Sequence, residues 1–493
     1  MKTIAIFVCA SFSIEFNLHA QFTVGYDPEI QETANMQYFV PKGNDLFVGD
    51  CIPFSHDGTY YLYWLLDSAH HSALNRLGGH QWVVSTTKDL KTWKHYPVVL
   101  GIDEEWEKSI CTGSVVHSND KFYAFYATRL IADGEVKEQL SYAISDDGIH
   151  FEKQKPNPFY NSAPGYSQRD FRDPKVFVDQ DGFFHLFVAS RLNKSSIKKL
   201  DGVLVHMVSK DLGNWELKPP VLTGQGSVPE CPDYFKWNDW YYLVYGDHGD
   251  THYLKSKSPY GPWQQPDSQA LVEKWLNVAK TASFMGNRRI AAGWIPSRKN
   301  NKDDGNEIFG GNAVFRELVQ QENGTLGTKF PSEMIPKTER PLTIDLLMDS
   351  LTKKLSENSF SVSAPNGIGT AHFESVPKDC SITLEVEPDG PNEEFGLILR
   401  AQQDGSGGYK LTFSADNRTV QLHDTMIYAV AGLDKHFMVN IIMKDGIVDV
   451  DIDNRRCIVN RLLEEKGNVL WFFAKHGNVK IKSITISPLS NTN

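Results

Sequence analysis

A strand pattern rich in aromatic residues recurs five times between residues 60 and 294, and it limits the possible folds more than any other feature of the chain. Four copies follow a tight-turn pair, such as Asp57-Gly58 or Asp181-Gly182. A tight turn that leads into a β-rich run is typical of a hairpin. The five runs are Tyr60-Tyr61-Leu62-Tyr63-Trp64, Phe122-Tyr123-Ala124-Phe125-Tyr126, Phe183-Phe184-His185-Leu186-Phe187, Trp240-Tyr241-Tyr242-Leu243-Val244-Tyr245 and Arg289-Ile290-Ala291-Ala292-Gly293-Trp294.

A second repeat alternates with the first. Each copy begins with a serine at a strand end, passes through a polar turn and ends on an aromatic residue that opens the next strand. The copies are residues 85–93, 145–151, 209–215 and 256–263. Repeated units of several strands are typical of β-propeller blades. The alternative is a long β-sandwich with accidental similarity, but the constant phase of the two repeats favours a propeller with five blades.

The pattern changes after Pro331. Residues 340–355 are a mixed connector, and short alternating strands follow from Phe360, separated by turns such as Lys444-Asp445-Gly446. Strands of this kind are typical of a second, all-β sandwich domain. We therefore predict an all-β chain, with a five-bladed β-propeller at residues 21–338 and a C-terminal β-sandwich at residues 339–493.

Residues 1–20 have the pattern of a secretory signal peptide. Lys2 provides a positive start, residues 4–12 form an apolar run too short to span a bilayer, and Leu18-His19-Ala20 offers a cleavage site before Gln21. The alternative is a buried N-terminal strand. No other stretch is long and apolar enough to span a membrane. We therefore expect a protein that is secreted, periplasmic or held at the cell surface.

Removal of this leader would leave five cysteines, so at least one thiol would be free or paired with another molecule. Cys380 and Cys457 share the C-terminal region and could pair, although the sequence does not establish their separation. The cysteine spacings do not resemble a zinc site, and we expect no metal and no organic cofactor. Three sequons match the glycosylation pattern, at Asn193, Asn323 and Asn417.

The charge balance is acidic. The chain has 61 Asp and Glu residues against 50 Lys and Arg residues, a formal net charge of −11. An acidic protein is a poor candidate for binding a phosphate backbone, so a nucleic acid is not the expected partner.

Three acidic residues occupy equivalent positions in the repeat. Asp50, Asp173 and Glu230 each precede an aromatic strand by ten residues, since 60−50, 183−173 and 240−230 are equal. The inner strands of propeller blades face one central channel, so these carboxylates should converge there. Crowded carboxylates push their pKa values apart, which allows one to act as an acid and another as a nucleophile about 5–5.5 Å away. The alternative is that these acids cap turns or pair with basic side chains.

Short motifs along nearly the whole mature chain resemble those of glycoside hydrolase family 32, the β-fructosidases that include invertases, inulinases and levanases. Each motif is weakly specific, but their order and spacing together are strongly specific. The matching segments are Phe171-Arg172-Asp173-Pro174-Lys175-Val176, Glu230-Cys231-Pro232-Asp233, Cys111-Thr112-Gly113-Ser114-Val115-Val116, His80-Gln81-Trp82 with Asp89-Leu90 and Trp93, residues 289–294, and the C-terminal residues 395–409 and 447–454.

The resemblance implies roles for particular residues. Glu230 would be the general acid/base, and Asp173 with Arg172 would hold fructose hydroxyls and stabilise the transition state. The family's nucleophile motif, Trp-Met-Asn-Asp-Pro-Asn-Gly, is absent, and its best counterpart is Asp50, with Asp45 as the rival. The resemblance also implies a group of substrate-binding residues, namely Arg172, Thr112, Trp82, Trp294 and Cys231.

The sequence departs from the family around the expected sugar pocket. The family's Trp and Asn before the nucleophile fall near Val48 and Gly49, its Gln falls near Leu65, and its first Trp of the next stretch falls near Leu77. The family's Phe in the Ser-Gly motif is Cys111. A different set crowds the rim: Asp67, His70, His71, Arg76 and His80. The absence of any accompanying ligand motif favours a solvated loop over a metal site for that set.

The resemblance therefore implies a retaining glycoside hydrolase that cleaves β-fructosidic bonds in fructans, sucrose or related fructosides, as a divergent member with altered substrate preference. One alternative is a five-bladed glycosidase acting on arabinose or xylose polymers, which the anomer first released would distinguish. The other is a non-catalytic glycan-binding propeller, which would bind fructosides without releasing sugar.

Overall fold

The computed structural model describes residues 25–31, 35–343 and 345–490, so the expected leader at residues 1–20 lies outside the described part. Almost all of the regular structure is β-strand. The helical segments are α1 (Ala73–Arg76) and the 3₁₀ turns Glu29–Gln31, Met285–Asn287, Lys299–Asn301 and Ser332–Met334. In the described residues, no helix has the length and apolarity needed to cross a membrane.

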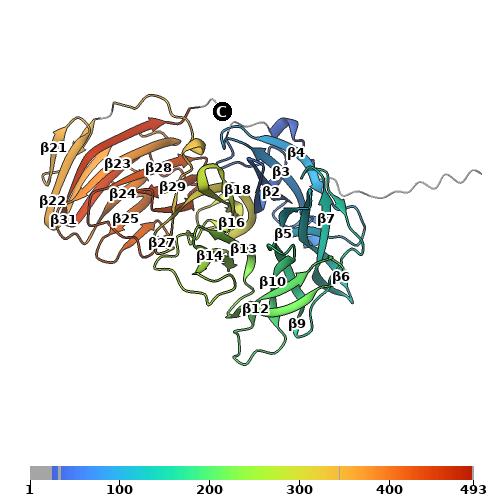
Figure 1. Cartoon of the computed structure of the whole chain (residues 1–493). Helices are drawn as coiled ribbons and strands as arrows, with labels where there is room; N and C mark the ends of the chain where they lie inside the picture. The colour runs from blue at the N-terminus through green and yellow to red at the C-terminus, as the bar shows by residue number, and fades with distance from the viewer. Residues whose placement is uncertain (1–24, 32–34, 344, 491–493) are drawn as a thin grey trace, which may run out of the picture.

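The N-terminal part of the described chain is a propeller of five blades, as predicted (Figure 1). The first blade is β1 (Leu46–His56), β2 (Thr59–Ser68), β3 (Gln81–Thr87) and β4 (Lys94–Leu100), and the second is β5 (Ser109–Ser118), β6 (Lys121–Ala132), β7 (Glu135–Ser145) and β8 (Glu152–Lys153). The third is β9 (Tyr166–Val178), β10 (Phe184–Leu192), β11 (Gly202–Ser209) and β12 (Glu216–Gln225). The fourth is β13 (Glu230–Trp237), β14 (Trp240–Asp247) and β15 (Asp250–Ser256), and the fifth is β16 (Asn277–Phe284), β17 (Arg288–Arg298), β18 (Glu307–Gln320) and β19 (Leu326–Lys329).

The inner strands close the ring. β1, β5, β9, β13 and β16 contact one another in that order, and β16 returns to β1. The repeated aromatic run is the second strand of each blade, in β2, β6, β10, β14 and β17. Its rings fill the apolar clusters between neighbouring blades; Tyr63 and Tyr126, for example, pack with Trp82 of β3 between the first two blades. Burial of these large rings supplies much of the hydrophobic stabilisation that holds adjacent blades together.

The C-terminal part is a β-sandwich of twelve strands in the described residues. The twenty-residue strand β31 (Val469–Pro488) pairs with β22, β23 and β24, and one apolar cluster that includes Phe360, Leu384 and Phe472 lies inside. The other strands are β20 (Leu346–Met348), β21 (Thr352–Ser356), β22 (Ser359–Phe373), β23 (Cys380–Pro388), β24 (Glu394–Ala401), β25 (Gly407–Ser414), β26 (Thr419–Leu422), β27 (Thr425–Ile427), β28 (Phe437–Lys444), β29 (Ile447–Ile452) and β30 (Arg456–Arg461). The placement of the domain boundary between residues 338 and 339 stays a prediction.

A buried ion cluster joins the two parts. Arg316 on β18 pairs with Glu273 and with Asp449 on β29, each at 2.7 Å, and the Tyr38 hydroxyl donates to Asp449 at 2.8 Å. Arg316, Glu273 and Asp449 are completely buried. An apolar cluster that includes Trp275, Ile442 and Val459 packs beside them. Polar and apolar contacts therefore both fix the sandwich against the propeller.

The five cysteines of the described residues are all buried free thiols. The pairing considered for Cys380 and Cys457 does not occur. Cys380 lies in the core of the sandwich, whereas Cys457 packs in the apolar cluster at the junction with the propeller. Both thiols therefore act as small apolar side chains.

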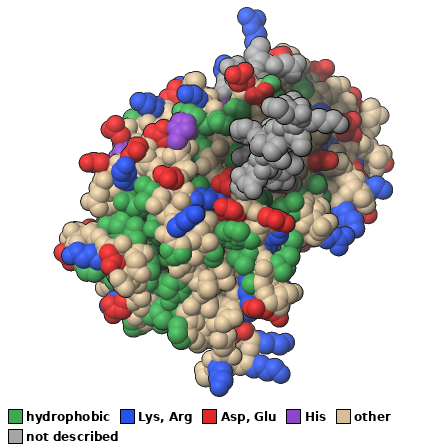
Figure 2. Space-filling model, turned by 90° about the vertical axis from the view of Figure 1, so that its right-hand side faces the viewer, with side chains coloured by type: hydrophobic (Ala, Val, Ile, Leu, Met, Phe, Trp, Pro, Cys, Tyr) green, Lys and Arg blue, Asp and Glu red, His purple; other side chains and the backbone are tan. Residues whose placement is uncertain are grey.

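Over the propeller face in Figure 2, acidic and basic side chains are interspersed.

Candidate active site

The pairing register slips at the same place in all five inner strands of the described propeller. The displaced residues are Gly49-Asp50 on β1, Cys111-Thr112 on β5, Asp173-Pro174 on β9, Cys231-Pro232 on β13 and Val278-Ala279 on β16. A β-bulge bends its strand and turns a side chain away from the regular alternation. Asp173, Cys231 and Val278 have positive φ angles of 53°, 48° and 37° at these bulges. The five bulges turn their side chains into one cavity at the end of the propeller channel.

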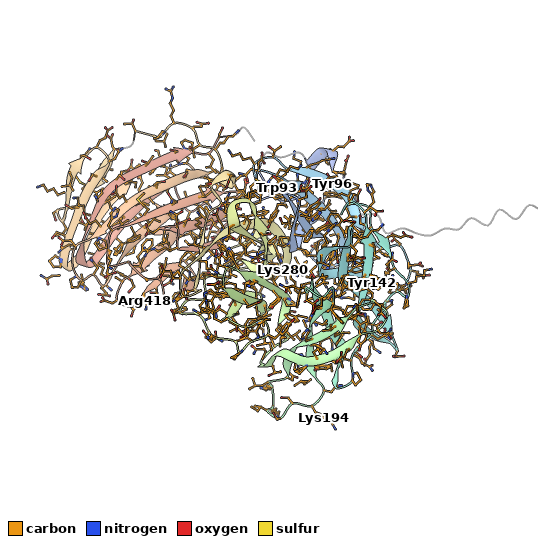
Figure 3. All side chains as sticks on the ribbon, in the orientation of Figure 1. Trp93, Tyr96, Tyr142, Lys194, Lys280 and Arg418 are labelled. Atoms are coloured by element: carbon orange, nitrogen blue, oxygen red, sulfur yellow. The ribbon has the colours of Figure 1, made fainter. Side chains whose placement is uncertain are left out.

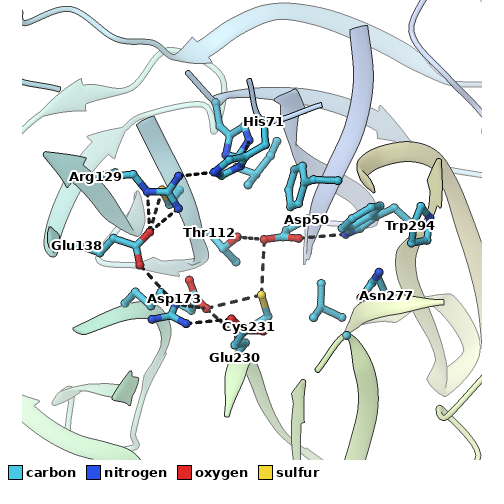
Figure 4. A pocket seen from close by; sticks show the side chains of 18 of the residues that line it. Asp50, His71, Thr112, Arg129, Glu138, Asp173, Glu230, Cys231, Asn277 and Trp294 are labelled. Carbon is cyan, nitrogen blue, oxygen red and sulfur yellow. Dashed lines mark hydrogen bonds and ion pairs between the residues drawn. The ribbon is translucent and has the colours of Figure 1, made fainter. Parts of the chain in front are cut away.

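That cavity has a volume of about 330 Å³ and contains all three predicted carboxylates (Figure 4). Its residues come from every blade, and the lining comprises Asp50, Leu65, His71, His80, Cys111, Thr112, Arg129, Glu138, Arg172, Asp173, Glu230, Cys231, Gly249, Asn277, Val278, Trp294, Pro296, Glu307, Ile308 and Phe309. A cavity of this size with convergent polar groups is the usual form of a small-molecule site.

Both carboxylate oxygens of Asp50 accept hydrogen bonds. The Trp294 indole N–H donates to Oδ1 at 3.0 Å, and the Thr112 hydroxyl donates to Oδ2. The Cys231 thiol lies 3.6 Å from the same Oδ2. Hydrogen bonds to both oxygens of a carboxylate fix its orientation. Asp50 is therefore held in one orientation facing the cavity.

Arg172 connects the other acids. Its Nη2 donates to Glu230 Oε1 at 2.9 Å, and its Nε lies 3.8 Å from Asp173 Oδ2 and 3.4 Å from Glu138 Oε2. Burial raises the pKa of Asp173 to about 7, Arg172 opposes that rise, and the charges of Glu138, Glu230 and Asp50 add to it. The Glu230 side chain is 39% exposed, against 6% for Asp173, so Glu230 lies on the open side of the cluster.

A buried lysine supports the cluster from within the propeller. Lys280 on β16 lies near the centre of the blades (Figure 3), and its Nζ donates to the Gly113 carbonyl at 2.6 Å. Gly113 follows Thr112 in the β5 bulge, so this bond also holds the hydroxyl that contacts Asp50. Burial lowers the pKa of Lys280, while the nearby Cys231, Asp233 and Asp173 raise it.

Four of the five predicted substrate-binding residues line the cavity, namely Arg172, Thr112, Trp294 and Cys231. The Cys231 backbone N–H donates to Asp173 Oδ2 at 3.0 Å. Trp82 does not line the cavity: its side chain is completely buried between blades, and its indole N–H donates to the Cys111 carbonyl at 2.9 Å. Its motif predicted proximity to the site, but the strand turns this ring into the core. Asp45, the rival nucleophile, is exposed and does not line the cavity.

The histidine group is also not a solvated loop. Asp67 and His80 are buried and lie 3.1 Å apart, and His71 Nδ1 lies 3.2 Å from His80 Nε2. Burial lowers the pKa of His71 to about 4, and the neighbouring His80 and Arg129 lower it further. His71 is therefore neutral at physiological pH and forms part of the cavity wall. Among the described residues, no group of three or more His, Cys, Asp or Glu is arranged to hold a metal ion.

An ion pair on the second blade was not predicted. Arg129 on β6 and Glu138 on β7 are cross-strand neighbours, and Arg129 Nη2 lies 2.6 Å from Glu138 Oε1. Arg129 Nη1 lies 2.7 Å from His71 Nε2, and Glu138 contacts Arg172. From Arg129 through Glu138 and Arg172 to Glu230, the linked side chains therefore alternate in charge along one wall of the cavity. Neither residue lies in a recognisable motif, so no local signal could have identified the pair.

The comparisons with known proteins agree with this architecture. The family model described as "Glycosyl hydrolases family 32 N-terminal domain" matches residues 52–326. Sucrose-6-phosphate hydrolase of Escherichia coli is 28% identical over 281 residues, which are 52% of this chain and 57% of that enzyme. Levanase of Bacillus subtilis (strain 168) is 24% identical over 512 residues, 92% of this chain and 70% of the levanase. The chain thus spans little more than half of the first of these relatives.

Two solved structures show the same fold. Fructan 1-exohydrolase IIa from Cichorium intybus has a TM-score of 0.71 at 16% identity, covering 93% of this chain and 98% of that one. Exo-inulinase from Aspergillus awamori has a TM-score of 0.67 at 16% identity, covering 94% and 99%. At such low identity these structures establish the fold of the whole described chain and not the chemistry of its pocket.

Proposed function

This chain belongs to glycoside hydrolase family 32, and from that premise we propose that it hydrolyses β-fructosidic bonds with retention of configuration. The observation that carries the proposal is the meeting of Asp50, Asp173 and Glu230 in one cavity, with Arg172 bonded to Glu230 and both oxygens of Asp50 bonded. Relatives include a levanase and sucrose-6-phosphate hydrolases. The proposed substrates are fructans, sucrose or related fructosides.

The positions of the acids suit a double displacement. Asp50, fixed inside the cavity, attacks the anomeric carbon of the fructosyl unit while Glu230, on the open side, protonates the departing oxygen. Glu230 then takes a proton from water, which displaces Asp50 and releases fructose. Arg172 and Asp173 hold the ring hydroxyls throughout. The exposed position of Glu230 allows it to reach both the leaving group and the incoming water.

The test is hydrolysis of sucrose, inulin, levan and short or cyclic fructosides by the protein and by Glu230→Gln and Asp50→Asn. We expect each variant to lose about 10²–10⁴-fold or more in kcat on the substrates that the protein cleaves. Asp45→Asn is the matched control, because Asp45 is an exposed acid on the same approach to β1, and it should retain full activity. NMR of the first-released anomer should show retention.

Two outcomes would contradict the proposal. Unchanged hydrolysis by Glu230→Gln would show that the acid/base is misassigned. Binding of fructosides by the protein without any sugar release would support the non-catalytic glycan-binding propeller instead. Release of arabinose or xylose from their polymers, with no action on fructosides, would point to the other glycosidase class, which the family match does not favour.

We also propose that the protein is exported. The support is the pattern of residues 1–20, with a basic start, a short apolar run and Ala20 before Gln21. N-terminal sequencing of protein recovered from outside the cytoplasm should begin at Gln21. A protein that keeps Met1 and stays in the cytoplasm would contradict this proposal.

A further inference from the structure

Gly49, the residue before Asp50, leaves a space that an aromatic ring occupies. A Cβ added at Gly49 would lie 2.9 Å from Phe309 Cε1, 3.0 Å from Phe309 Cζ and 3.1 Å from Leu65 Cβ. The backbone of Gly49 does not have a positive φ angle, so other residues could adopt its conformation. The ring of Phe309 and the stem of Leu65 are therefore what excludes a side chain here.

The backbone that carries Phe309 is held in place and cannot easily withdraw. The Phe309 carbonyl lies 2.8 Å from His70 Nδ1. Gly310 has a φ of 82°, and a Cβ there would lie 2.7 Å from Asp67 Oδ2. A Cβ at Gly311 would lie 1.8 Å from the Ile295 carbonyl oxygen. The two glycines let β18 approach its neighbours closely, and this packing directs the ring of Phe309 into the cavity.

Phe309 packs on other residues of the site. Its ring stacks on His80 with centroids 4.9 Å apart and an angle of 21° between the planes, and it lies 4.7 Å from the Trp294 ring. Trp294 is the residue that donates to Asp50. Together the apolar residues form one wall of the cavity: Leu65, Val278, Trp294, Pro296, Ile308 and Phe309.

Another part of the lining is charged, and it adjoins Phe309, whose ring lies 5.4 Å from the ring of His71, a partner of Arg129. Figure 4 shows Arg129 and Glu138 on one side of Asp50 and Trp294 on the other. The charged side offers hydrogen-bond donors and acceptors for sugar hydroxyls, whereas the apolar side offers none from Phe309 or Leu65. A sugar in this cavity finds hydrogen-bonding groups at Arg129 and Glu138, whereas a hydroxyl that faces Phe309 finds no partner on that ring.

We propose that Phe309, in the space left by Gly49, is a specificity-determining residue that makes this site recognise one edge of the fructosyl unit by apolar contact. The inference rests on the proposed function and specifies which contact at that site selects the substrate. A hydrogen-bonding site rejects a substrate that lacks the bonded hydroxyl by about 10⁴-fold, whereas an apolar pocket distinguishes the two by only about 10–100-fold. The ligand class is therefore β-fructofuranosides, including forms that lack the hydroxyl facing Phe309.

The test compares a simple alkyl β-fructofuranoside with its 1-deoxy and 6-deoxy forms, which lose one hydroxymethyl oxygen each. For the unaltered protein, at least one deoxy form should keep kcat/KM within about 100-fold of the parent. Phe309→Tyr places a hydroxyl on the apolar wall, and it should shift the selectivity between that deoxy form and the parent by tenfold or more towards the parent. Loss of more than 1000-fold for both deoxy forms would overturn the proposal.

A double-mutant cycle tests the pairing of Gly49 with Phe309. Gly49→Ala should lower kcat/KM about tenfold or more, because its methyl group displaces the ring. In the Phe309→Ala background the same change should cost less than threefold, so the two effects are not independent. Effects that simply multiply would refute the coupling. Tyr428→Ala is the control, since Tyr428 is 65% exposed on the sandwich, and it should alter none of these ratios.

The ratio of kcat/KM between the parent fructoside and its deoxy forms distinguishes a role of Phe309 in substrate selection from a purely structural role. Displacement of Trp294 by a Phe309 variant would lower kcat on the parent and the deoxy forms alike and leave their ratio unchanged, which would count against the proposal. Calorimetry in the Glu230→Gln background gives the corresponding ratios of binding constants for the parent and the deoxy forms. If the protein hydrolyses no fructoside, the proposed function fails, and the binding ratios still decide whether Phe309 selects the ligand.

Discussion

Replacement of Arg316 by Met should destabilise the protein strongly. The guanidinium is completely buried and bonds two carboxylates: Nη2 donates to Glu273 Oε2 at 2.7 Å and to Asp449 Oδ1 at 2.7 Å, and Nη1 donates to Asp449 Oδ2 at 2.9 Å. Breaking one buried ion pair by removing a partner costs about 3–5 kcal/mol. Since Arg316→Met strands two buried carboxylates, we expect a loss at the upper end of that range near neutral pH.

The loss should depend on pH in a defined direction. Burial raises the pKa of Glu273 and of Asp449, and Arg316 opposes both rises. Without Arg316 both acids would titrate at a still higher pH in the folded chain than in the unfolded chain. Groups with a raised folded-state pKa add stability at low pH and lose it as the pH rises. The variant should therefore recover stability as the pH falls from about 7.5 towards about 5.

Urea unfolding of the full chain, followed by tryptophan fluorescence at both pH values, measures the effect. Lys378→Met is the control, because Lys378 pairs with Glu465 on the surface and its removal should change nothing measurable. The charge-free combination of Arg316→Met, Glu273→Gln and Asp449→Asn should regain most of the loss. A cost below about 1 kcal/mol at neutral pH, or a larger cost at acid pH, would refute the reasoning.

Two further predictions concern the cavity. Trp294→Phe removes the N–H that bonds Asp50, so kcat/KM should fall about 10–100-fold. Trp82→Phe removes a hydrogen bond in the core, so it should lower the free energy of unfolding by about 1–3 kcal/mol and leave KM unchanged. A larger kinetic effect from Trp82→Phe than from Trp294→Phe would contradict the assignment. Glu138→Gln removes a negative charge that helps to hold the pKa of Asp173 at about 7. The acid limb of the profile of kcat/KM against pH should therefore move to lower pH. An acid limb that stays in place would show that Asp173 does not control it.

The repeat predicted the propeller because strand periodicity and turn chemistry are local properties. The same phase also predicted that Asp50, Asp173 and Glu230 would meet, and the cavity contains all three. Trp82 shows the limit of such reasoning. Its motif placed it beside the site, but the structure buries the ring between two blades. Proximity in a motif does not say which face of a twisted strand a side chain occupies.

Local periodicity was thus enough to indicate the strands, the blades, the sandwich and the meeting of three acids, although the bulges place Asp50, Asp173 and Glu230 one position apart in register. Closure of the propeller alone decided which other side chains join them. Glu138, which pairs with Arg129, reaches Arg172 from another blade, and Phe309 fills the space at Gly49 from β18, the strand that pairs with β1. These contacts depend on packing and charge between segments far apart in the chain, and no pattern within one strand encodes them. The character of the pocket is therefore a property of the closed ring.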